Sequence, residues 1–150
     1  MFFKNAGSDT LVVSFPACAP NAARYNYVRA LSAFNCDKMF LLDDFGTNHQ
    51  GCYLVEDRVE SCVKSLICSK LIGGGYKRVI FIGSSKGGYI ALNFSFLFPD
   101  ITAIIGAPQY FLGDYLGGPS HLPNLRYILG DDITEETGIE RKVEEQNPDK

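Results

Sequence analysis

The sequence predicts an α/β domain with three layers, in which helices cover both faces of a doubly wound, mostly parallel sheet of about five strands. Two observations predict this fold. Short apolar runs alternate along the chain with stretches whose apolar residues recur at helical spacing. The short runs are apolar throughout, which is typical of parallel strands buried on both faces. The 150 residues suffice for one hydrophobic core, so we expect a single domain over residues 1–150.

Five segments have the composition of buried strands. They are rich in β-branched and other apolar residues, and they end at a proline, a glycine or a pair of acidic residues. In chain order they are Leu11–Phe15, Met39–Leu42, Arg78–Ile82, Ile101–Ile105 and Leu125–Leu129. The carboxyl ends of the strands in such a sheet form the edge at which ligands bind.

Three segments have helical spacing. The evidence is best in Glu56–Ile72, where the apolar residues fall on one stripe and Gly73–Gly75 follows as a terminating signal. We also predict helices over Arg24–Phe34 and over Gly87–Phe98, which Pro99 stops. We expect the glycine- and proline-rich segment 109–124 to be a loop or a short excursion, and the charged residues 134–150 to be solvated.

Composition and charge exclude several classes of protein. The net charge of −3 leaves no basic footprint for nucleic acid, and no apolar run approaches the ~20 residues of a membrane span. The N-terminus lacks the basic stretch and long apolar run of a signal peptide. The five cysteines match no zinc or redox spacing. We therefore expect a cytoplasmic protein with reduced thiols, no metal site and no other cofactor.

The run Val79–Gly88 carries the most informative motif. Apolar strand residues lead into Gly83–Gly87, which has the pattern Gly-x-Ser-x-Gly, and a helical segment follows. In this setting the chain turns sharply from strand to helix and exposes the central hydroxyl, so Ser85 is a candidate nucleophile. The alternative is a glycine-rich turn that only lets strand and helix pack closely. A phosphate-binding loop does not fit, because its lysine would follow the second glycine.

A nucleophilic serine needs an acid that orients its base, and N–H groups that stabilise the oxyanion. Asp131 and Asp132 follow the second strand predicted after Ser85, so they are the candidate acids. The N–H of Lys86, directly after the serine, would donate one hydrogen bond to the oxyanion. A second N–H would come from Ala17 or Cys18, in the loop after the first strand.

The base in a triad of serine, histidine and acid is a histidine, and the sequence offers none at the expected position. His49 and His121 are the two histidines of the chain, and neither follows the candidate acids. Either the chain is a piece of a longer protein in which one more strand precedes the histidine, or His121 acts from an unusual position in its loop. Both histidines also fit as ordinary loop residues. Without a base, Ser85 is a weak nucleophile at neutral pH.

A second polar group follows the strand predicted before the long helix. Asp43 and Asp44 end that strand, and the loop over residues 47–53 carries His49 among other polar side chains. We interpret Asp43 and His49 as candidate substrate-binding residues, because polar side chains near the strand-to-helix turn at Ser85 suit a sugar-like or other polar ligand. The alternative is that the two aspartates cap a turn or a helix.

These features resemble the α/β-hydrolase superfamily. The resemblance is carried by Leu11–Phe15, Asp43–Tyr53, Gly83–Gly88 and the segment Gly106–Gln109 with Leu112-Gly113. More narrowly, the chain resembles bacterial capsular-polysaccharide biosynthesis proteins of the XcbB/CpsF-like group and the hydrolase-like domain of the accessory secretion system's glycan O-acetyltransferase. The resemblance implies acyl transfer or ester hydrolysis on acetylated glycans, with Ser85 as the nucleophile and Lys86 as an oxyanion donor.

The sequence thus predicts a serine esterase or acyltransferase acting on a small-molecule or glycan ester. The rival hypothesis is a non-catalytic hydrolase-like module that binds a glycan or a partner protein in a biosynthetic or secretion complex. Three departures from the family pattern favour the rival. Pro16–Cys18 replaces the usual histidine-glycine motif, Ile133 occupies the usual position of the acid, and no later histidine follows. A sheet without its final strand would leave an open edge, which is a reason to expect a homodimer.

Overall fold

The computed structural model of the chain describes residues 1–19, 22–46, 51–55 and 57–129. Its centre is a five-stranded sheet with the order β1-β3-β2-β4-β5. The strands are β1 (Phe2–Lys4), β2 (Thr10–Ser14), β3 (Asp37–Phe40), β4 (Arg78–Ser84) and β5 (Ile101–Gly106). β1 runs antiparallel to β3 and the other neighbours are parallel, so the sheet is mixed but mostly parallel. The predicted α/β fold with flanking helices is confirmed.

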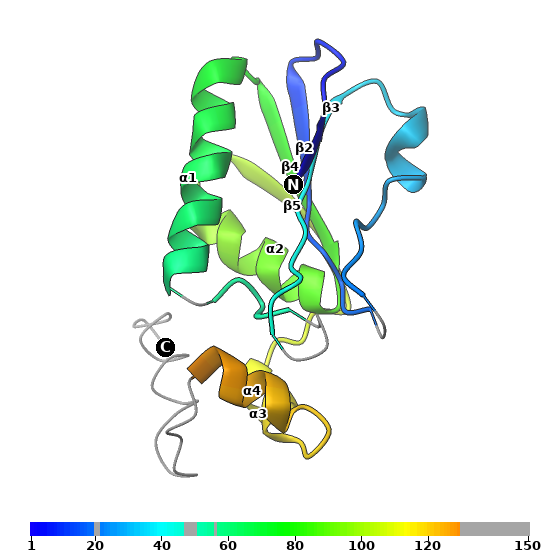
Figure 1. The fold of residues 1–150 in the computed structure, drawn as a ribbon. Helices are drawn as coiled ribbons and strands as arrows, with labels where there is room; N and C mark the ends of the chain where they lie inside the picture. The colour runs from blue at the N-terminus through cyan, green and yellow to red at the C-terminus, as the bar shows by residue number, and fades with distance from the viewer. Residues whose placement is uncertain (20–21, 47–50, 56, 130–150) are drawn as a thin grey trace.

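Helices lie beside the sheet, and two of them lie beyond one of its ends (Figure 1). The helical elements are η1 (Ala30–Ala33), a 3-10 turn, and the α-helices α1 (Asp57–Gly74), α2 (Lys86–Phe96), α3 (Leu112–Gly117) and α4 (Leu122–Leu129). α3 and α4 lie together beyond the end of the sheet at which β5 terminates. Within the described ranges, no helix has the length and apolar character needed to cross a membrane.

The two faces of the sheet carry separate hydrophobic clusters, as the strand period of two requires. Leu11 and Val13 of β2 belong to the larger cluster, which α1 and α2 cover. Val12 belongs to the smaller cluster on the opposite face, where Leu31 of η1 packs. Burial on both faces is the reason that the strand sequences are apolar throughout.

Two of the predicted helices are confirmed. Glu56–Ile72 corresponds to α1, whose last residue is followed by Gly75 at φ +60°. Glycine adopts this left-handed conformation at little cost, which explains why the glycine run ends the helix. Gly87–Phe98 corresponds to α2, whose Ile90 is completely buried in the larger cluster.

The predicted strand Leu125–Leu129 is wrong. These residues form the second half of α4, in which Leu125 and Ile128 are buried at a helical spacing of three. A short apolar run has no periodicity that separates a strand from a buried helical segment. Pro123 fits the first turn of a helix, where its missing N–H is not needed. The sheet still has five strands, because β1 in the N-terminal segment, where the sequence predicted no strand, takes the place of the wrongly predicted one.

The predicted helix Arg24–Phe34 is also wrong over most of its length. Only Ala30–Ala33 is helical, as η1. Tyr27 has φ +62°, a left-handed conformation that interrupts a right-handed helix, although its carbonyl oxygen still accepts the N–H of Leu31 at 2.8 Å. The strand predicted at Met39–Leu42 is present as β3, beginning and ending two residues earlier.

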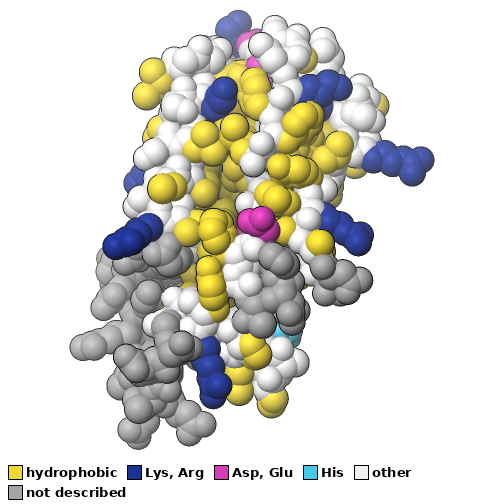
Figure 2. Space-filling model, viewed as in Figure 1, with side chains coloured by type: hydrophobic (Ala, Val, Ile, Leu, Met, Phe, Trp, Pro, Cys, Tyr) yellow, Lys and Arg dark blue, Asp and Glu magenta, His cyan; other side chains and the backbone are white. Residues whose placement is uncertain are grey.

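Apolar side chains also reach the surface. Figure 2 shows hydrophobic side chains gathered over the middle of one face of the molecule, between the α1 side and the η1 side. On β5 the burial alternates along the strand, and Ile104 is 52% exposed. β5 is an outer strand, and its far edge pairs with no strand of the described chain. This part of the sheet therefore presents apolar surface to its surroundings.

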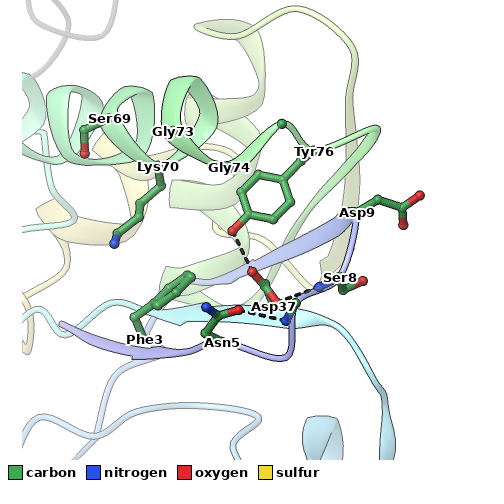
Figure 3. A pocket seen from close by; sticks show the side chains of 12 residues that line it. Phe3, Asn5, Ser8, Asp9, Asp37, Ser69, Lys70, Gly73, Gly74 and Tyr76 are labelled. Atoms are coloured by element: carbon green, nitrogen blue, oxygen red, sulfur yellow. Dashed lines mark hydrogen bonds between the residues drawn. The ribbon is translucent and has the colours of Figure 1, made fainter.

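A polar cavity lies at the end of the sheet opposite to Ser85 (Figure 3). The buried carboxylate of Asp37 accepts hydrogen bonds from the N–H groups of Ala6 (2.8 Å) and Ser8 (3.1 Å) and from the Tyr76 hydroxyl (2.8 Å). Desolvation alone would raise the pKa of Asp37, but these hydrogen bonds together lower it below the ordinary value of 3.8. The network fastens the N-terminal segment to β3 and to the segment after α1.

We expect Tyr76→Phe to lower the free energy of unfolding by about 1 kcal/mol near neutral pH, because it removes one hydrogen bond to a carboxylate. Since the folded-state pKa of Asp37 lies below 3.8, this stabilisation is present above that pH and is lost as the pH falls through the folded-state value. Desolvation and the bond to Asp37 raise the pKa of Tyr76 to about 12, so the contribution is also lost as the pH rises through that value.

Urea unfolding at neutral pH and below pH 3.8 measures this difference. Tyr25→Phe is the matched control, since Tyr25 is an exposed tyrosine whose ring contacts Phe2. An equal loss of stability in both variants, or a loss that does not change with pH, would contradict the assignment.

Candidate active site

Ser85 lies between a strand and a helix at the carboxyl end of the sheet. β4 ends at Ser84 and α2 begins at Lys86, so the chain changes direction around one residue. Ser85 has φ +52° and ψ −124°, a combination that residues with a side chain rarely adopt. Its N–H donates to the carbonyl oxygen of Gly106 at the end of β5 (2.9 Å). The sharp strand-to-helix turn that the motif predicts is therefore present.

The two glycines of the motif leave no room for a side chain. A Cβ atom on Gly83 would overlap the carbonyl oxygen of Gly87. A Cβ atom on Gly87 would lie 2.6 Å from the carbonyl oxygen of Phe15, directly after β2. The glycines thus let the turn close on itself and let α2 start against the segment that follows β2.

The hydroxyl of Ser85 has a partner from the segment after β5. Gln109 Nε2 donates a hydrogen bond to Ser85 Oγ (2.8 Å). Gln109 Oε1 is buried and has no hydrogen-bond partner among the described residues. Because Oγ accepts this bond, the hydroxyl hydrogen of Ser85 can still be donated to a base. Gln109 lies within the segment that carries the family resemblance, but the sequence predicted no role for it at the site, although its position just after the carboxyl end of a strand was a signal.

The loop after β2 carries the two candidates for the second oxyanion donor. The N–H of Ala17 donates to Asn26 Oδ1 (2.9 Å), so it already has an acceptor. The Ser14 hydroxyl donates to the carbonyl oxygen of Asn26 (2.9 Å), which holds Asn26 against the end of β2. Cys18 and Lys86, the first residue of α2, remain predicted oxyanion donors.

A buried ion pair lies beside the turn. Lys86 Nζ is 3.0 Å from Asp43 Oδ2, and the two side chains are 1% and 0% exposed. The Asp43 carboxylate also accepts the N–H groups of Cys52 (3.0 Å) and Tyr53 (3.1 Å). The sequence-based interpretation expected Asp43 to bind a substrate. In the structure its buried carboxylate instead accepts donors from the chain itself. Removing one member of such a pair costs about 3–5 kcal/mol.

Two titratable groups beside this ion pair, those of Cys52 and Tyr53, are kept neutral. Burial, and after it the charge of Asp43, raises the pKa of the Cys52 thiol to about 12, which keeps the thiol protonated and unreactive. Burial also raises the pKa of Tyr53, and the nearby Cys18 contributes to that shift. The Tyr53 ring packs edge-on against Tyr89 of α2, with centroids 6.0 Å apart. Cys52 therefore does not compete with Ser85 as a nucleophile.

The candidate base His121 lies in the short connection between α3 and α4. Its ring stacks on Tyr115 with centroids 4.3 Å apart, and the described structure shows no hydrogen bond between its imidazole and Ser85. Three other predicted site residues lie outside the described part of the chain: His49, Asp131 and Asp132. The structure thus brings Ser85 together with Gln109 and Lys86, and among the described residues it places no imidazole beside them.

No cluster of three or more His, Cys, Asp or Glu side chains within the described ranges is placed to hold a metal ion. The prediction that the site uses no metal remains a prediction, because three of the candidate residues lie outside those ranges.

Comparison with known proteins gives matches among solved structures. The chain is similar to a capsule O-acetyltransferase. That protein is from Neisseria meningitidis serogroup A. Its structure in complex with caged gadolinium matches with a TM-score of 0.70 and 26% identity, over 87% of this chain and 56% of that one. A second structure of it matches with a TM-score of 0.70 and 25% identity, over 89% and 55%.

This chain therefore spans about half the length of the capsule O-acetyltransferase that it matches. No protein-family model matches the chain, and no curated protein sequence matches it either. The structural similarity to a capsule O-acetyltransferase agrees with the capsule-related part of the resemblance that was drawn from the sequence.

We expect Gly83→Ala to destabilise the protein by about 1–3 kcal/mol, because the new methyl group overlaps a main-chain carbonyl that cannot rotate away. Gly73→Ala is the matched control. A Cβ atom there meets nothing within 4 Å, and alanine favours the helix α1. Thermal unfolding followed by circular dichroism compares the two variants. Equal stability of the two would show that the turn tolerates a side chain at Gly83.

We expect Gln109→Ala to be nearly neutral in stability, because the substitution removes one hydrogen bond and one unsatisfied buried oxygen together. The same variant should react about 10-fold more slowly with a fluorophosphonate at Ser85, the cost of one hydrogen bond that positions Oγ. Mass spectrometry of the labelled protein over time gives the rate. An unchanged rate would mean that Gln109 does not position the hydroxyl.

Proposed function

We propose that the chain carries the nucleophile of an acyl-transfer reaction, as part of a serine esterase or O-acyltransferase. The backbone of Ser85 carries this proposal. The residue is strained, it stands alone between β4 and α2, and its hydroxyl is held by Gln109. Such strain persists where the surrounding structure maintains it, and it is concentrated at functional sites.

The reaction has two steps. Ser85 Oγ attacks the carbonyl carbon of an acyl donor while its proton passes to a base, and a tetrahedral oxyanion forms. The N–H of Lys86 and an N–H of the loop after β2 stabilise the oxyanion. The intermediate collapses to an acyl-serine, and the leaving group takes the proton from the base. Water or an acceptor hydroxyl then attacks the acyl-serine while the base takes its proton. As the acyl group leaves Ser85 Oγ, the base returns that proton to Oγ, which regenerates Ser85.

The base is one of the two histidines of the chain in this proposal, oriented by Asp131 or Asp132. His121 is described, and reaching Ser85 requires it to leave its stacked position on Tyr115. Lys86 does not serve as the base, because its ammonium group donates to the carboxylate of Asp43.

A glycan hydroxyl as the acyl acceptor is the finer part of the proposal. It is supported by the similarity to a capsule O-acetyltransferase at a TM-score of 0.70. The amide of Gln109 also supports a polar ligand, because its oxygen is buried beside Ser85 without a partner among the described residues. We place this reaction in the cytoplasm, in a protein that pairs with a second copy through an open sheet edge.

A binding module is the second candidate function. One observation favours it: in the described part of the chain, the partner of Ser85 Oγ is an amide and not an imidazole. A protein that kept the strand-to-helix turn but lost the base would bind a glycan or a partner protein without catalysing a reaction on it.

Fluorophosphonate labelling separates the two functions. If Ser85 is activated, the probe labels the protein and Ser85→Ala abolishes the labelling. Ser95→Ala is the matched control and should label normally, because that serine lies further along α2 and donates to the carbonyl oxygen of Leu92. Hydrolysis of an acetyl ester by the same variants gives a second readout. A folded wild-type protein that is neither labelled nor hydrolytic would favour the binding module.

A further inference from the structure

The lysine that follows the nucleophile does not have the environment of a surface residue. Lys86 is 1% exposed, and its ammonium nitrogen lies 3.0 Å from the carboxylate of Asp43, itself completely buried. A buried ammonium group is costly unless a counter-charge compensates it. A hydrophobic residue would fill the same space without this cost. The presence of the pair therefore calls for an explanation in terms of what it holds in place.

On the Asp43 side, the pair holds a strained turn. Gly51, Tyr53 and Leu54 have φ values of +93°, +59° and +54°, and the last two are buried residues with side chains. Non-glycine residues keep this conformation only where the surroundings impose it. The carboxylate of Asp43 does so by accepting the N–H groups of Cys52 and Tyr53.

On the Lys86 side, the pair holds the strand-to-helix turn around Ser85, which we call the nucleophile turn. Lys86 is the first residue of α2, and its peptide unit joins it to Ser85. With Nζ fixed 3.0 Å from Asp43 Oδ2, the main chain at Lys86 is anchored through its own side chain. Gly51 completes the arrangement, since a Cβ atom there would overlap both Lys86 Nζ and Asp43 Oδ2.

We propose that Lys86 and Asp43 act as a positioning ion pair, which joins the strained turn at residues 51–54 to the nucleophile turn and fixes the peptide between Ser85 and Lys86. The inference deepens the proposed function and rests on it where it concerns catalysis. Orienting that peptide orients the N–H that stabilises the oxyanion. The pair contributes position and not proton transfer.

Three variants disrupt the pair by different means. Lys86→Met removes the ammonium group, Asp43→Asn removes the carboxylate charge, and Gly51→Ala places a methyl group between the partners. Two controls match them. Lys38→Met removes another buried lysine, which donates to main-chain carbonyl oxygens away from the turn. Gly7→Ala puts alanine at a similar positive φ, +68°, in open space.

The first measurement is the second-order rate of fluorophosphonate labelling at Ser85, below the unfolding temperature of every variant. We expect a loss of about 100-fold or more in the three disrupting variants, the effect of a misplaced oxyanion donor. The double variant of Lys86→Met and Asp43→Asn should lose no more than the single ones, because the two residues act as a unit. The controls should keep the wild-type rate even if their stability falls.

The second measurement does not depend on catalysis. Hydrogen exchange should become faster in the peptides that cover residues 51–55 and 83–90 of the Lys86→Met and Gly51→Ala variants, and it should stay unchanged within α1. This result would support the positioning role even in a wild-type protein that the probe fails to label, in which case only the proposed function fails. Unchanged exchange in both peptides, wild-type labelling rates in the folded variants, or an equal loss in the controls would each overturn the inference.

Discussion

The turn around Ser85 depends on main chains approaching more closely than side chains allow. Gly83 lies against the carbonyl of Gly87, and Gly87 lies against the carbonyl of Phe15, so β4, the start of α2 and the end of β2 meet with no Cβ atom between them. The N–H of Ser85 then reaches the carbonyl oxygen of Gly106 on β5. The parallel strands β2, β4 and β5 are thus tied to the turn around Ser85, whose strained backbone these contacts maintain.

An aspartate stands at each end of β3, and the two have the same kind of surroundings. Asp37, at the start of the strand, accepts two main-chain N–H groups and the hydroxyl of Tyr76. Asp43, just after its end, accepts two main-chain N–H groups and the ammonium group of Lys86. Both carboxylates organise irregular backbone that the sheet itself cannot hold. The difference lies in the third donor, which is the neutral hydroxyl of Tyr76 at the amino end of the strand and the charged ammonium group of Lys86 at its carboxyl end.

The similarity to a capsule O-acetyltransferase covers most of this chain and about half of that protein. An acyl-transfer site needs more than the strand-to-helix turn, since a base must reach Ser85 and a surface must hold the acceptor. The described structure contains Ser85, its partner Gln109 and the buried ion pair beside them.

The sequence by itself determined the fold class, α1, α2 and the position of the nucleophile turn. These features are local: continuous apolar runs mark buried strands, helical spacing marks α1, and glycines flank the serine where no side chain fits. It could not separate a strand from a helix at Leu125–Leu129, nor predict the left-handed Tyr27, because both depend on what packs against them. Only the tertiary structure placed Gln109 on Ser85 and Lys86 on Asp43. These partners are far apart in sequence, and the parallel sheet brings them together by ending its strands at one edge.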